Sequence, residues 1–195
     1  MAFNVRKAVT GGRLGAGRAI VGQVGAKARR VLSRGLRAAG ARGRAGRQAG
    51  DANRSDGVFR ADLSGFNQVP PILSPGKGTF RLQVAGDGMS AQYELSFSNL
   101  TTRAVVSHIH FGHPTDNGGI MVFLCGGGGK PDCPGRGGTV TGTITADDVV
   151  AVPGQGVAAG DLAGVLDIIR RGLAYVNVHT EQFPDGEIRG QIVPA

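Results

Sequence analysis

The chain has 195 residues, a net charge of +8 and an apolar fraction of 41%. This length suffices for one domain with a sizeable core, and no apolar run approaches the ~18 residues that a membrane span needs. The charge is unevenly divided, because residues 1–50 contain twelve Lys or Arg and no Asp or Glu, whereas the remainder contains ten basic and fourteen acidic side chains. The net positive charge therefore belongs to the amino-terminal segment alone.

Residues 1–55 form a basic head composed largely of Arg, Ala and Gly. Such a composition buries too little apolar surface to offset chain entropy, which predicts disorder or transient helix. An organelle-targeting peptide, non-specific binding to nucleic acid or anionic lipid, and an upstream translation that the mature protein lacks are the other interpretations. Because Gln23 and glycines interrupt the longest apolar stretch, AIVGQVGA, the head has no clear secretory signal peptide.

From Val58 onward, apolar and polar residues alternate with a period of two, which predicts β-strands. Glycine-rich and proline-rich turn signals follow at 85–88, 117–119, 153–156 and 184–186. Seven or eight short strands with this spacing predict an all-β, antiparallel β-sandwich. The predicted strands lie in FRADLSG, GTFRLQVAG, AQYELSFSNL, AVVSHIHF, IMVFLC, GTVTGTIT, AYVNVHT and EIRGQIV.

The segment 160–171 departs from this alternation. Its apolar residues Leu162, Val165, Leu166 and Ile169 have helical spacing, with an aspartate near the start and two arginines and a glycine at the end. Acidic residues favour the first turn of a helix, and basic residues with a following glycine favour the last. The pattern predicts one short helix between two strands.

The two cysteines, Cys125 and Cys133, lie eight residues apart in LCGGGGKPDCPG. This separation, through four glycines and a proline, favours a small disulfide-closed loop in an oxidising compartment. Metal ligation and two free thiols remain alternatives, although the spacing differs from the two-residue gap of a zinc ribbon.

An ordered series of motifs resembles the CHRD domain, the module first described in chordin. The series is SHIHFG, GGIMVFLC, TVTGTITADDV, GDLAGVL and AYVNVHTEQFPDGEIRGQIVP, and it extends from about Val58 to Pro194. We therefore divide the chain into the head, 1–55, and a CHRD-like domain, 56–195. The resemblance implies an immunoglobulin-like or superoxide-dismutase-like β-sandwich and an extracellular or periplasmic location. It implies no established enzymatic activity.

Three of the four histidines in the chain lie within SHIHFGHP, residues 107–114. On a strand, His108 and His110 would point to the same face. His179, near the end of AYVNVHT, could join them if the two strands are neighbours, and His113 could be a fourth ligand if the turn folds back. Such a group suits copper, with zinc less favoured. It also resembles the copper half of copper-zinc superoxide dismutase, although four histidines are too few for that enzyme's two-metal site.

Structural interpretations of the same residues stay open at this point. A His-x-His pair on a strand is often solvated or hydrogen-bonded, and His179 could simply bond to loop backbone near a strand end. Glu187 and Arg189, two residues apart on a predicted strand, fit an ion pair or a solvated face better than catalysis. No Ser-His-Asp or paired-carboxylate arrangement stands out, so we assign no catalytic residue.

The sequence supports two alternative functions. The first is a non-enzymatic binding module for another extracellular protein or a matrix polymer, with no specific nucleic-acid partner and no membrane span. The second is a mononuclear copper protein, redox-active or copper-carrying, that uses His108, His110 and His179. Imidazole nitrogens within roughly 3–4 Å of one another would favour copper, because metal–nitrogen bonds are near 2 Å.

Overall fold

The computed structural model describes residues 57–195, so the predictions for the basic head lie outside the described residues. The described part is almost entirely β-structure, with one α-helix, α1 (Leu162–Arg170). All strand pairs are antiparallel. The strands are β1 (Val58–Ser64), β2 (Lys77–Val84), β3 (Ala91–Ser98), β4 (Ala104–Phe111), β5 (Ile120–Cys125), β6 (Gly138–Ile144), β7 (Ala174–Thr180), β8 (Ile188–Gln191) and β9 (Val193–Pro194).

These strands form one strongly curled sheet, in the order β5-β4-β7-β8-β1-β2-β3-β6, with β9 paired to β1. The curl brings the two end strands, β5 and β6, into contact, so the sheet is nearly a closed barrel. The all-β class, the antiparallel pairing and the single helix are as predicted. The two-residue β9 is too short to leave an alternating pattern in the sequence.

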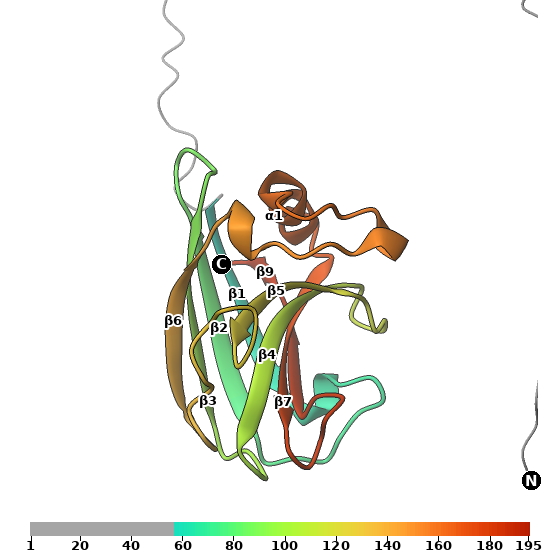
Figure 1. Cartoon of the computed structure of the whole chain (residues 1–195). Helices are drawn as coiled ribbons and strands as arrows, with labels where there is room; N and C mark the ends of the chain where they lie inside the picture. The colour runs from blue at the N-terminus through green and yellow to red at the C-terminus, as the bar shows by residue number, and fades with distance from the viewer. Residues whose placement is uncertain (1–56) are drawn as a thin grey trace, which may run out of the picture. The chain divides into compact units, whose positions relative to one another are not determined.

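The core lies inside the curl, because the apolar residues of the alternating pattern point inward. On β1, Phe59, Ala61 and Leu63 are buried, while the polar residues between them are exposed. Helix α1 lies at one end of the curled sheet (Figure 1) and buries its predicted apolar residues. The side chain of Asp161 caps this helix by accepting a hydrogen bond of 2.9 Å from the backbone N–H of Gly164.

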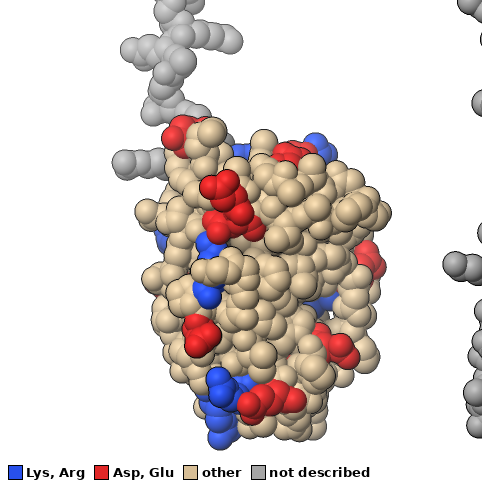
Figure 2. All heavy atoms as spheres, in the orientation of Figure 1, with Lys and Arg blue, Asp and Glu red and all other residues tan. Residues whose placement is uncertain are grey.

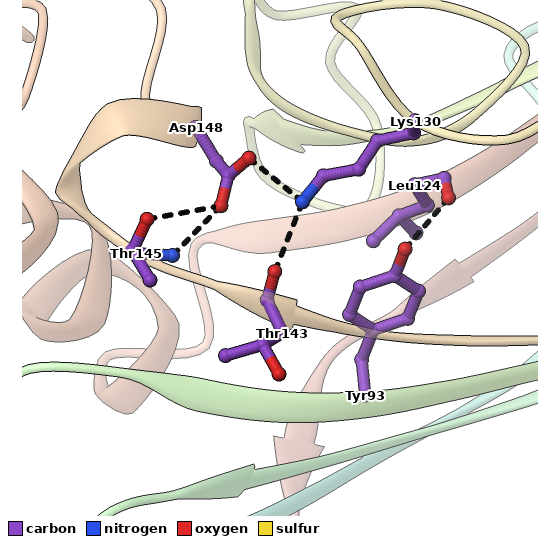
Figure 3. A network of polar contacts seen from close by, with 6 residues as sticks. All are labelled: Tyr93, Leu124, Lys130, Thr143, Thr145 and Asp148. Atoms are coloured by element: carbon purple, nitrogen blue, oxygen red, sulfur yellow. Dashed lines mark hydrogen bonds and ion pairs between the residues drawn. The ribbon is translucent and has the colours of Figure 1, made fainter.

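The gap between β5 and β6 is bridged by side chains rather than by a backbone ladder (Figure 3). Lys130, in the loop after β5, donates to the carbonyl of Thr143 on β6 at 2.9 Å and pairs with Asp148 at 2.7 Å. Tyr93 donates to the carbonyl of Leu124 on β5. Burial alone would raise the pKa of Asp148, but hydrogen bonds from Lys130 and Thr145 outweigh it and lower that pKa.

Replacing Lys130 by methionine should lower the free energy of unfolding by about 1–3 kcal/mol, because the partly buried Asp148 loses its cation. Arg171→Met is the matched control. Arg171 and Asp167 form an ion pair of similar length, 2.8 Å, but both side chains are more than half exposed, so we expect little or no loss. Urea denaturation measures both values, and equal losses would contradict the bridging role of Lys130.

The disulfide between Cys125 and Cys133 is present, with a Cα–Cα separation of 5.1 Å, as predicted. It closes the glycine-rich loop that follows β5. Acidic and basic side chains are scattered in small groups over the face that Figure 2 shows, and most of that face is uncharged. Among residues 57–195, no helix is both long enough and apolar enough to cross a membrane.

Candidate metal centre

Strands β4 and β7 are neighbours, which is the condition that the sequence left open for the histidines. In the register, His108 lies opposite Asn177 and His110 lies opposite Tyr175. His179 is two residues beyond Asn177 and therefore points to the same face. The intervening residues, among them Ile109, Val176 and Val178, are fully buried on the core face. The sheet thus places all three imidazoles on the side of β4 and β7 that faces away from the core.

The three rings converge. One ligand nitrogen from each of His108, His110 and His179 lies within 4.8 Å of the others. One pair, Nδ1 of His108 and Nε2 of His179, is 3.2 Å apart. That pair meets the predicted 3–4 Å spacing. Ligands of a three- or four-coordinate ion with bonds near 2.1 Å lie about 3.4–3.6 Å apart, so a pair at the 4.8 Å limit would have to move closer by about 1.2–1.4 Å.

Backbone carbonyls orient two of the rings. Nδ1 of His110 lies 3.0 Å from the carbonyl oxygen of Gly118, and Nδ1 of His179 lies 2.8 Å from that of Pro184. A carbonyl can only accept, so each Nδ1 carries the proton and each neutral ring keeps its lone pair on Nε2. Such an outer hydrogen bond is how metal-binding histidines are commonly held. Nε2 of His110 is buried and has no partner among the described residues.

The site favours neutral imidazole, which is the form that binds metals. Burial lowers the pKa of His108 to about 3, and the neighbouring His179 and His110 add to the effect. Burial also lowers the pKa of His110 to about 4, against the opposing hydrogen bond to Gly118. The pKa of His179 is lowered by burial as well. Near neutral pH the three rings therefore keep their lone pairs without first losing protons.

The disulfide-closed loop covers one side of the group. The ring of Phe123, on β5, packs edge-on against His108 with centroids 4.6 Å apart. Gly127 and Gly128 lie against that ring so closely that a Cβ at either position would come within 2.8 Å of it. The glycines of this loop are therefore needed for close packing over Phe123, and Phe123 in turn shields His108 from water.

A stack of side chains supports the other end of the group. The ring of Tyr175 lies parallel to His110, with centroids 4.7 Å apart. The guanidinium of Arg189, on β8, lies over the Tyr175 ring at 3.4 Å from its centroid. Tyr175 accepts a hydrogen bond from the backbone N–H of Gly118, the residue whose carbonyl orients His110. One loop residue and one aromatic ring thus hold His110 in place.

His113, the candidate fourth ligand, is not a member of the converging group. Its side chain is exposed, and its backbone carbonyl accepts a hydrogen bond of 2.7 Å from Arg189. The structure therefore places His113 in the turn after β4, and this turn does not bring its ring into the group.

Glu187 and Arg189 differ from the prediction, since they form neither an ion pair nor a solvated face. Both are buried, at 0% and 1% exposure. The carboxylate of Glu187 accepts hydrogen bonds from Ser74, Thr101 and Thr180. These partners come from distant loops and strands. The local alternation of apolar and polar residues therefore could not show that Glu187 and Arg189 are buried.

The fold and site together define a small, nearly closed β-domain that holds three neutral histidines under loops on one outer face of its sheet. The model of the CHRD domain matches residues 59–192, and the chain belongs to this family. No curated protein matches the chain.

Proposed function

We propose that this CHRD domain binds one transition-metal ion through His108, His110 and His179, with copper favoured over zinc. The single observation that carries the proposal is the convergence of three imidazole nitrogens within 4.8 Å. Copper(II) binds nitrogen ligands most strongly among the common divalent first-row ions, and the group contains no carboxylate that would favour magnesium or calcium. Copper bound there would supply one-electron redox chemistry.

Three features of the ligands support the proposal. Two rings have the tautomer that presents Nε2, because Nδ1 of each bonds to a carbonyl. His110 has a buried nitrogen with no protein partner among residues 57–195, which a metal would satisfy. His108 alone must change tautomer to bind the metal. Its Nδ1 faces the lone pair on Nε2 of His179, so this Nδ1 carries a proton when no metal is bound and must give it up to become a ligand.

The direct test is the metal content of the full chain. After removal of all metals and addition of excess copper(II) or zinc(II), followed by gel filtration, elemental analysis should find about one copper per chain and a smaller zinc content. A variant in which both His108 and His110 are glutamine should retain none above background. The proposal fails if this double variant retains as much copper as the wild type.

A location in an oxidising compartment, extracellular or periplasmic, is part of this proposal. The disulfide between Cys125 and Cys133 supports it, because such bonds persist outside reducing compartments. Recovery of the chain from culture medium or periplasm with the Cys125–Cys133 pair oxidised would agree. Recovery only from the reducing interior, with free thiols, would not.

A second candidate function is the binding module for another extracellular protein or a matrix polymer. It is favoured by the segment between β1 and β2, where Phe66 and Leu73 are exposed at 61% and 86%. Exposed apolar side chains that form a contiguous patch are typical of contact surfaces. Cosedimentation of the chain with the envelope or matrix fraction of its cells, reduced at least twofold by Leu73→Ser, would support this function. An unchanged bound fraction would oppose it.

A further inference from the structure

A cavity of about 500 Å³ lies beside the segment that follows β1 and the turn that follows β4. Its size is within the range of small-molecule sites. Part of its wall is apolar, from Phe66, Val69 and Pro114, and part is polar, from Arg189 and Gln191. None of the three converging histidines lines it, so the cavity is separate from the proposed metal centre.

Arg189 brings to this wall a positive charge with no acidic partner. The ion pairs among residues 57–195 are Arg103 with Glu181, Lys130 with Asp148 and Arg171 with Asp167. The hydrogen bonds of Arg189 run from Nη1 and Nη2 to the carbonyls of His113 and Asp116 and to the amide oxygen of Asn117. These oxygens carry no formal charge, and the Asp116 carboxylate lies beyond ion-pair distance.

The charge of Arg189 is therefore buried without full compensation. One face of its guanidinium is covered by Tyr175, and the side chain is 1% exposed. Burial lowers the pKa of Arg189, against smaller opposing effects of Tyr175 and Asp116. An uncompensated buried charge is costly, and an anion in the cavity would relieve that cost.

Gln191 adds a second unsatisfied group. Its Nε2 donates to the carbonyls of Gly112 and Gly172, at 3.0 and 2.7 Å, which uses both of its hydrogens and settles which amide atom is nitrogen. Its Oε1 is buried and accepts from no described residue. A hydrogen-bond donor brought by a ligand would satisfy this oxygen.

We propose that this cavity binds a small organic carboxylate with an apolar body and a hydroxyl group. The carboxylate pairs with Arg189, the apolar body contacts Phe66, Val69 and Pro114, and the hydroxyl donates to Oε1 of Gln191. Arg189 also holds the turn that contains His113 and Asp116, so the same side chain serves the fold and the ligand.

The probe for the test is 4-hydroxyphenylacetate, titrated into the full, metal-free chain labelled with ¹⁵N in a chloride-poor buffer. Backbone amide signals of residues 66–69 and of Thr115 should shift, with a dissociation constant in the millimolar range for a ligand of about eleven heavy atoms. The neutral analogue 4-hydroxyphenylacetamide should bind at least about tenfold more weakly, because it cannot pair with Arg189. Phenylacetate, which lacks the hydroxyl, should bind more weakly than the hydroxylated acid.

The second test leaves Arg189 in place, because its hydrogen bonds to the turn after β4 support the fold. It compares two variants of Thr115 instead. Thr115 is exposed and lines the cavity, so Thr115→Asp adds a negative charge at the cavity and Thr115→Asn does not. The Asp variant should bind 4-hydroxyphenylacetate several-fold more weakly than the Asn variant, and both should bind the amide alike. Equal binding of acid and amide, shifts confined to other residues, or no binding would each overturn the proposal.

Discussion

His110→Gln is expected to weaken copper binding by more than about 100-fold. Loss of a residue that only orients a metal ligand by a hydrogen bond typically lowers metal affinity 10–100-fold. His110 is proposed as one of only three direct ligands, so its loss should cost more. Its Nε2 is also the buried ligand nitrogen that has no partner among the described residues. Glutamine has similar size and polarity, so the loss would reflect ligation rather than packing. Competition with a chelator of known affinity measures the change.

The matched control for this prediction is His113→Gln. This substitution removes the histidine that lies nearest in sequence but outside the converging group. The hydrogen bond to Arg189 uses the backbone carbonyl of residue 113 and survives the substitution. Copper affinity should therefore stay within about twofold of the wild type, well inside the scatter of surface substitutions. A large loss in this control, or none in His110→Gln, would mean that the ligands are other residues.

The free energy of unfolding of the metal-free protein should fall as the pH is lowered from about 6.5 towards 4. The pKa values of His108 and His110 are about 3 and about 4 in the folded state, against about 6.5 when unfolded. Between these values the unfolded chain binds protons that the folded chain does not. The stability that neutral histidine provides is thus complete above pH 6.5 and is lost on acidification.

Each of these two histidines adds up to about 1.4 kcal/mol per pH unit to the slope. Urea denaturation between pH 6.5 and 5, with a chelator present, measures this slope. The interval lies above the pH range in which most carboxylates titrate. The slope should decrease when both His108 and His110 are replaced by glutamine. Identical slopes in the wild type and this double variant would show that the histidines do not remain neutral in the folded domain.

The sequence predicted the core of the candidate site because strand periodicity is a local property. A period of two was enough to place His108 and His110 on one face, and the same period assigns His179 to one face of its own strand. The convergence of His179 with His108 and His110 depended on β4 and β7 being neighbours, which is a property of the sheet order. The sequence left that order open.

The surroundings of the site could not be predicted from the sequence. The carbonyls of Gly118 and Pro184 orient two rings from loops, and loop conformation follows from tertiary packing rather than from periodicity. The burial of Arg189 and Glu187 likewise depends on segments more than seventy residues away, such as those of Asn117 and Thr101. Charged residues are rarely buried, so composition argued for exposure in both cases.

The closure of the sheet also bears on how this protein behaves at high concentration. Open sheets present rows of unpaired backbone groups on which strands of other molecules can add. Here the outer edge of β5 is occupied by the segment after β6, through a bridge between Val122 and Val149 and a hydrogen bond from Val150 to Met121. The edge of β6 is occupied in part by Lys130. The edge of β5 is therefore not left bare, which protects this end of the sheet against fibril growth by strand addition.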